Sequence, residues 1–106
     1  MSVTLRLATK SDLPEILSLV KELALYEKAP EQVTNTLEKM EEDGFGAHPI
    51  FHTILAESPT DGIVGMSLYY FRYSTWKGKR LYLEDLIVRE KFRGFGYGKM
   101  LFNTTV

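Results

Sequence analysis

The apolar positions near the start of the chain change their period from two to about 3.6. Val3 to Leu7 alternate between apolar and polar residues, which predicts a short strand over residues 3–7. Asp12 is a capping residue, Glu15 follows three positions later, and Pro14 suits a first helical turn. Apolar residues then recur on one helical face, at Leu13, Ile16, Leu17, Val20, Leu23 and Ala24. These features predict an amphipathic helix that runs to about Lys28, before Pro30.

The rest of the chain alternates between apolar runs and turn signals. A second helix is predicted over residues 35–42, ended by a left-handed glycine cap within residues 43–46. Strands are predicted over residues 51–57, 63–73 and 80–88, with Gly-containing and Pro-containing turns between them. Short turns favour an antiparallel meander, and a last helix is expected from about Gly98. The expected fold class is α/β (α+β), in the order strand, two helices, three strands, glycine loop and helix.

Composition removes several classes of function. The 106 residues suit a single domain, and 44% apolar with 25% charged residues is ordinary for a soluble protein. A net charge of −1 argues against a general nucleic-acid partner, and no apolar run is long enough for a membrane span. Without cysteine there is no disulfide or thiolate chemistry, so a cytoplasmic protein is expected. His48 and His52 flank Pro49 and do not suggest a metal site.

A glycine-rich segment, residues 93–99, follows the last predicted strand and opens the last predicted helix. Glycines at alternate positions let backbone N–H groups approach a ligand, and a helix start favours an anion. Arg93 and Lys99 add positive charge, so a diphosphate is the expected ligand. The segment lacks the Gly-Lys-Ser/Thr ending of a Walker loop and the glycine spacing of a dinucleotide fold. The alternative is a glycine-rich surface turn with basic neighbours.

Two adjacent carboxylates, Glu84 and Asp85, interrupt the strand predicted over residues 80–88, whose apolar residues on both faces predict cover on both sides. Strict alternation would place the two side chains on opposite faces of the sheet. A carboxylate here can attract a protonated amine, whose pKa is about 10, and accept its proton. The alternative is that either residue is solvent-facing or part of a structural ion pair.

The pattern Arg-x-x-Gly-x-Gly, with Arg93, Gly96 and Gly98 in the named positions, resembles the pyrophosphate loop of the GCN5-related N-acetyltransferases (GNAT). Further stretches resemble the spermidine/spermine N1-acetyltransferase family, and residues 74–78 are closer to its thialysine-acetylating branch. These stretches are Lys21-Glu22-Leu23-Ala24, Tyr26-Glu27, Glu42-Asp43-Gly44-Phe45-Gly46, Tyr69-Tyr70-Phe71, Tyr82-Leu83-Glu84-Asp85 and Arg93-Gly94-Phe95-Gly96.

The resemblance implies acetyl transfer from acetyl-CoA, as cosubstrate, to a primary amine by direct attack in a ternary complex. It implies that Tyr26 and Glu27 line the amine site and that Glu84 acts as base through water, while the acidic Asp85 also suits a cationic substrate. The coenzyme would be held by the backbone and loop residues Leu86, Ile87, Val88, Arg93, Gly94, Phe95, Gly96, Tyr97, Gly98 and Lys99.

The resemblance also bears on how much of a domain this chain supplies. Family members continue for roughly half as many residues again and carry a downstream tyrosine that protonates the leaving thiolate. Residues 1–106 are therefore expected to be an N-acetyltransferase domain that is incomplete at its C-terminal end, and family members form homodimers. The alternatives are an acetyl-CoA-binding module and a truncated, inactive fragment. Tyr73 and Trp76 are expected to be turn or core residues rather than substrate contacts.

Overall fold

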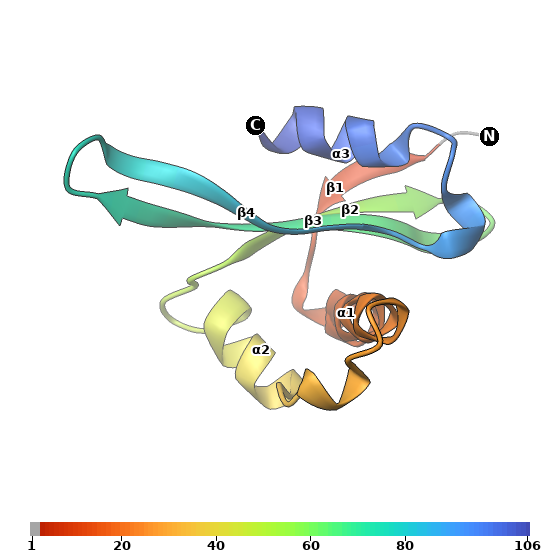
Figure 1. The fold of residues 1–106 in the computed structure, drawn as a ribbon, viewed down its shortest axis with the longest axis horizontal. Helices are drawn as coiled ribbons and strands as arrows, with labels where there is room; N and C mark the ends of the chain where they lie inside the picture. Colours follow the sequence, from red (N-terminus) through yellow and green to blue (C-terminus); the bar gives the residue numbers. More distant parts are fainter. Residues whose placement is uncertain (1–2) are drawn as a thin grey trace.

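The computed structural model describes residues 3–106 and places one sheet between two helical layers (Figure 1). Ten elements follow one another along the chain. They are β1 (Thr4–Leu7), the 3-10 turn η1 (Lys10–Asp12), α1 (Leu13–Tyr26), η2 (Pro30–Gln32), α2 (Leu37–Phe45), β2 (His52–Ser58), β3 (Gly62–Ser74), β4 (Gly78–Val88), η3 (Glu90–Phe92) and α3 (Tyr97–Thr105).

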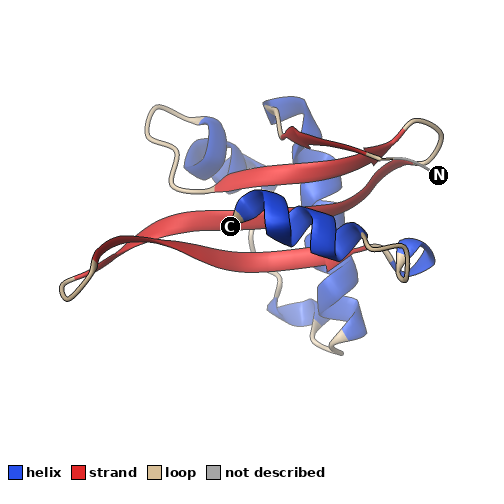
Figure 2. Cartoon of the chain, turned by 90° about the horizontal axis from the view of Figure 1, so that it is seen from above, coloured by secondary structure: helices blue, strands red, loops and turns tan. Residues whose placement is uncertain are grey.

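The sheet has the strand order β1-β2-β3-β4, and each neighbouring pair is antiparallel. Helices α1 and α2 cover one face, and α3 lies across the other (Figures 1 and 2). This arrangement confirms the α/β class and the three-strand meander predicted from the turn signals. Within residues 3–106, no helix is long and apolar enough to cross a membrane.

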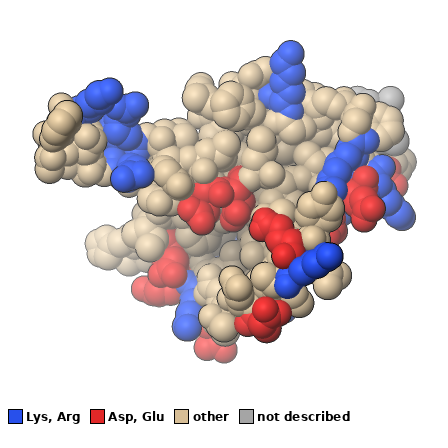
Figure 3. Space-filling view, in the orientation of Figure 1, with Lys and Arg blue, Asp and Glu red and all other residues tan. Residues whose placement is uncertain are grey.

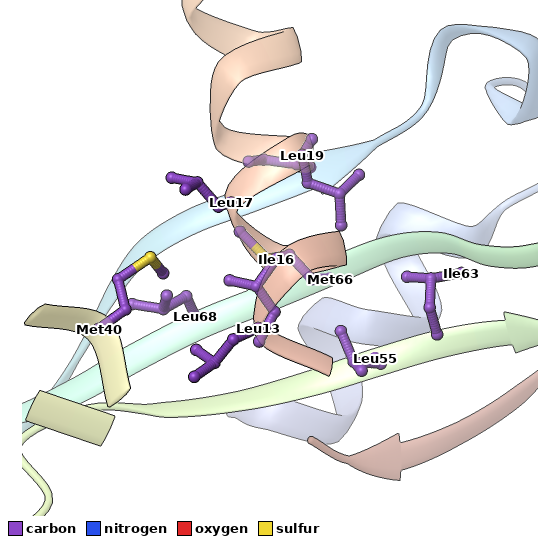
Figure 4. Close-up of a cluster of buried hydrophobic side chains, with 10 residues drawn as sticks. Leu13, Ile16, Leu17, Leu19, Met40, Leu55, Ile63, Met66 and Leu68 are labelled. Atoms are coloured by element: carbon purple, nitrogen blue, oxygen red, sulfur yellow. The ribbon is translucent and has the colours of Figure 1, made fainter. Parts of the chain in front are cut away.

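The larger core lies between α1 and the sheet. Ile16 and Leu19 of α1 are fully buried against Leu55 and Met66 of the central strands, and Met40 is the buried anchor of α2 (Figure 4). Burying one such side chain contributes about 1.5–3 kcal/mol. The helical periodicity of the sequence therefore selects the face of α1 that contacts the sheet.

A smaller core lies under α3. Leu101 and Tyr97 of α3 pack on Ile54, Ala56 and Val64 of the sheet. Near the end of the helix, the Thr105 hydroxyl donates to the Leu101 carbonyl, and the Ser67 and Thr105 hydroxyls hydrogen-bond across to β3. These contacts hold α3 against β2 and β3.

The helix ends differ from the sequence predictions. Asp12 precedes α1, but its carboxylate binds the Arg6 guanidinium (2.8 Å) and the Thr9 amide (2.7 Å) instead of capping the helix. The ion pair with Arg6 is the main reason why the pKa of Asp12 falls to about 2. Helix α1 ends at Tyr26, slightly before the predicted end.

Helix α2 begins two residues later than predicted, because Thr36 caps it by accepting from the Lys39 amide. Its end was predicted wrongly. Gly44 lies inside the helix, and Gly46 after it has φ −81°, so no left-handed glycine cap forms. Helix α3 starts at Tyr97, one residue before the predicted Gly98.

The β3–β4 hairpin extends beyond the helical layers (Figures 1 and 2). At its tip, Trp76 is 92% exposed and Tyr73 is 76% exposed, so both lie outside the core. The sequence predicted that residues 80–88 would be covered on both faces. That prediction is wrong for most of β4, because the hairpin projects beyond the helices (Figures 1 and 2), and Tyr82 and Leu86 are each 40% exposed.

Candidate functional site

A hollow of about 370 Å³ lies where β4 passes into the glycine loop. Leu86 and Val88 of β4 and Phe92 of η3 line it. The remaining lining comes from the predicted anion-binding segment: Arg93, Gly94, Gly96, Tyr97 and Gly98. The end of a strand, a glycine loop and a helix start therefore meet around one concave surface.

The loop backbone needs glycine at two positions. Gly94 has φ 91° and Gly96, the residue before α3, has φ 84°, a region that other residues rarely adopt. A Cβ atom built at either position meets no protein atom within 4 Å, so the backbone faces open space there. The amides of the first turn of α3 have no acceptor within the helix. This combination suits an anion such as a diphosphate.

Arg93 supplies a cation at the rim of the hollow. Its Nε donates to the Val88 carbonyl (3.0 Å), and its guanidinium lies 5.1 Å from the centre of the Tyr26 ring. Lys99 is exposed in the first turn of α3, and the Phe95 ring stacks on Tyr97 at 5.8 Å. Tyr97 is only 4% exposed, so it anchors the helix start in the smaller core.

The two carboxylates of β4 lie at a bulge. Leu68 pairs with Asp85 while the next residue, Tyr69, pairs with Leu83, so Glu84 has no partner residue on β3. Two residues of β4 thus face one residue of β3, and the alternation of side chains is broken. Glu84 is nevertheless exposed and Asp85 is partly buried, so the two carboxylates differ in environment, as the sequence predicted. They are still near enough for the charge of Glu84 to raise the pKa of Asp85.

Electrostatics at the bulge are unfavourable in the free protein. Burial raises the pKa of Asp85, and the negative charges of Glu84 and Glu27 raise it further. Glu27 directly follows α1, and Glu84 is exposed. Figure 3 shows acidic side chains gathered in the middle of one face, between the strand layer and the helices. A cation placed among these carboxylates would relieve their mutual repulsion.

The structure divides the predicted site residues into two groups. Glu27, Glu84 and Asp85 form an acidic cluster, and residues 93–99 form the loop around the hollow. Tyr26, predicted beside the amine, contacts Arg93 of the loop instead. Leu86 and Val88 line the hollow, whereas the Ile87 side chain is 3% exposed and packs under α1, so only its backbone is available at the strand edge.

Sequence reasoning missed a set of ion pairs that fixes the loop. Arg89 binds Glu15 (2.7 Å) and Glu22 (3.0 Å), both on α1, and the Glu90 amide donates to Glu22 (3.2 Å). The seven-residue spacing of Glu15 and Glu22 places them on one helical face. That spacing was the available signal, but a charged face usually indicates only solvent contact. Phe92 was missed because nothing in its sequence context distinguishes it.

A metal centre and a second cleft were the other candidates for a site, and the structure supports neither. In the part of the chain that the structure describes, no three His, Asp or Glu side chains gather as metal ligands would. A larger cleft of about 780 Å³ lies between the start of α1 and α2, where Leu13 and Leu37 form apolar walls beside the Lys10–Glu41 ion pair. It lies at the starts of both helices, but it has no glycine loop, and Glu38 and Glu41 place negative charge on its wall, so size alone does not make it the site.

Comparison of the sequence with known proteins identifies the family of this chain. Residues 13–106 match the model of the acetyltransferase (GNAT) family. The chain is 44% identical over 107 positions to the thialysine N-epsilon-acetyltransferase of Sus scrofa, covering 94% of this chain and 63% of that protein. It is 41% identical over 100 positions to the human spermidine/spermine N(1)-acetyltransferase-like protein 1, covering 89% of this chain and 14% of that protein. The chain thus spans about three fifths of the length of the thialysine acetyltransferases it matches.

Solved structures agree on the fold. A possible acetyltransferase from Clostridium difficile 630 superposes with a TM-score of 0.79 at 22% identity, covering 98% of this chain and 68% of that one. A Trypanosoma brucei acetyltransferase gives 0.70 at 26% identity, covering 98% of this chain and 72% of that one. The family model covers the loop, the bulged strand and both helical layers, so the chain belongs to the acetyltransferase (GNAT) family.

Proposed function

We propose that the protein transfers the acetyl group of acetyl-CoA to a primary amine of a small cationic substrate, of the polyamine or thialysine type. One observation carries the proposal: an anion-binding hollow and a cluster of carboxylates lie next to each other along β4. Leu86 lines the hollow, and Asp85 directly precedes it. The names of the relatives, thialysine and spermidine/spermine acetyltransferases, support an amine as acceptor.

The residues around the hollow fit the coenzyme. Gly94 and Gly96 expose backbone to open space, and Arg93 and Lys99 bring positive charge to it, as a diphosphate requires. The exposed edge of β4 at residues 86–88 suits an extended amide-containing arm, which can pair with a strand edge. The coenzyme supplies an acetyl group activated as a thioester.

Glu84 is the proposed base. An alkylammonium, with a pKa of about 10, must lose a proton before its nitrogen can attack a thioester carbonyl. The carboxylate of Glu84 is exposed at the bulge and accepts that proton through a water molecule. In the balanced reaction a nitrogen–carbon bond forms, the carbon–sulfur bond breaks, and the sulfur leaves as a thiolate that takes up a proton.

Asp85 and Glu27 are proposed to attract the amine. Both carboxylates make the local potential more negative. The pKa of Asp85 is raised by burial and by neighbouring negative charges, so its charge is poorly compensated in the free protein. A bound ammonium supplies the missing counter-charge, so part of the repulsion stored at the bulge is released on substrate binding.

The proposal includes a homodimer. Its support is the projecting β3–β4 hairpin, whose Tyr73 and Trp76 side chains are mostly exposed, because exposed aromatic residues are enriched at interfaces.

Release of free thiol from acetyl-CoA is the direct test of the proposed reaction. We expect the 106-residue chain to release thiol in the presence of spermidine, thialysine or lysine, faster than without amine. The amine that gives the highest rate identifies the branch. Equal rates with and without amine would contradict the proposed transfer. Coenzyme binding without turnover would leave the chain as a binding module.

Glu84→Gln should lower kcat at pH 7 by about 100-fold or more, because general-base catalysis contributes roughly 10²–10⁴-fold. The loss should shrink at pH 9, where the neutral fraction of the amine is about 100 times larger than at pH 7. Steady-state rates over this pH range make the comparison. Glu31→Gln, at an exposed glutamate outside the cluster, is the control. A pH-independent loss in Glu84→Gln would argue for a structural role.

Asp85→Asn should stabilise the free protein at neutral pH and raise KM for the amine. Because the folded-state pKa of Asp85 is raised, the folded protein binds this proton more tightly than the unfolded chain does. Ionised Asp85 therefore costs stability that appears as pH rises through its folded pKa, and the cost vanishes below the unfolded value near 3.9. Urea unfolding at several pH values should show the variant's advantage only at the higher pH. A destabilised variant at pH 7 would contradict the assignment.

Gly96→Val should abolish binding of CoA, because valine strains the backbone at φ 84° and its side chain enters the space beside the loop. Gly62→Val is a matched control. Gly62 has φ 75° and open space around it, but it is the first residue of β3, next to the β2–β3 turn and away from the loop. Both variants should lose similar stability in thermal unfolding, and calorimetry should show that only Gly96→Val loses CoA. Equal affinity in the two variants would remove the loop from the site.

A further inference from the structure

One stripe of α1 faces the segment that leads into the glycine loop. Glu15, Glu22 and Tyr26 are spaced seven and four residues apart, which places them on one side of the helix. Glu15 and Glu22 contact Arg89, and the Tyr26 ring contacts Arg93. The two arginines thus meet the same helix face with different kinds of partner.

Arg89 is held as a structural cation. Besides two carboxylates, its Nε donates to the Ile63 carbonyl (3.0 Å), and its amide donates to the Val64 carbonyl (2.8 Å). Its side chain is only 22% exposed, and two glutamates compensate its charge. Arg89 therefore fixes the start of the loop against α1 and β3 and offers no charge to a ligand.

Arg93 is held without being neutralised. Among the residues that the structure describes, no carboxylate oxygen lies within 4.0 Å of its guanidinium. Its anchors are the Val88 carbonyl and the face of the Tyr26 ring, which attracts a cation through its quadrupole. A carboxylate in the place of the ring would compete with an anionic ligand, whereas an aromatic face leaves the net positive charge in place.

We propose that Tyr26 is a positioning residue for the coenzyme: its ring holds the Arg93 guanidinium at the rim of the hollow with its charge available to the diphosphate. The inference rests on the proposed function, since it takes the anion to be that of CoA. It replaces the expectation that Tyr26 lines the amine site. It also predicts that a change on α1 alters affinity for the coenzyme in the absence of any amine.

The size of the effect follows from the exposure of the pair. Tyr26 is 67% exposed, and cation–π contacts at exposed sites contribute about 0.5–1 kcal/mol. Loss of the ring should therefore weaken CoA binding about 2- to 5-fold. Loss of the phenol hydroxyl alone should change little, because the cation lies over the ring face.

The test compares Tyr26→Leu with Tyr26→Phe by calorimetric titration of CoA without amine. We expect the phenylalanine variant to bind like the wild type and the leucine variant to bind about 2- to 5-fold more weakly. Leu25→Ala is the control, at a neighbouring position that is also 67% exposed. In the background of Arg93→Gln, the leucine substitution should have no further effect. At saturating acetyl-CoA, KM for the amine should be the same in the phenylalanine and leucine variants.

The possible outcomes separate the role of the ring from the proposed function. Equal CoA affinity in the leucine variant and the wild type, or equal weakening in the phenylalanine and leucine variants, would overturn the role of the ring while leaving the proposed function intact. A changed amine KM with unchanged CoA affinity would return Tyr26 to the amine site. Absence of CoA binding by the wild type would overturn the proposed function, and this inference with it.

Discussion

The pairing of β3 with β4 runs from the covered body of the sheet into the projecting hairpin, and one extra residue at Glu84 interrupts it. On the body side of the interruption, Ile87 faces α1 and Val88 faces α3. At the interruption, two carboxylates face a single residue of β3 at a place where side chains are only partly covered. The acidic cluster lies at this bulge, and the hollow and the tip of the hairpin lie on either side of it along the chain.

Charge is separated along β4 even though the net charge of the chain is only −1. Carboxylates gather at the bulge, and the cations Arg93 and Lys99 lie by the loop, a few residues further along the chain. This order matches a reaction that brings an ammonium and a diphosphate to neighbouring positions. The arrangement stores unfavourable energy at Asp85 in the free protein, which is common where binding sites trade stability for function.

Patterns that depend on local chemistry could be predicted correctly from the sequence. The period of Leu13, Ile16 and Leu17 indicated the buried face of α1, and turn residues indicated the order of the strands. The loop was predicted because positive φ angles at Gly94 and Gly96 have a direct residue signature. These local signals were sufficient to predict the fold class, whereas the family was inferred from the resemblance of whole stretches of the sequence.

Features that depend on pairing between distant segments could not be predicted. A bulge is a property of register, and neither strand alone contains the information that Glu84 lacks a partner. Asp12 carried a capping signature, but Arg6 of a different element binds its carboxylate more strongly than the helix end does. Tyr26 contacts Arg93 across a separation of 67 positions, and no local pattern reports such a contact.

The end of β4 and the glycine loop are proposed to form the coenzyme site. Titration of the ¹⁵N-labelled chain with CoA, followed by amide chemical shifts, tests this claim residue by residue. We expect the largest shifts at residues 86–88 and 94–99, with little change around Lys10 and Leu37 in the larger cleft. Shifts concentrated in that cleft, or no saturable shifts at all, would contradict it.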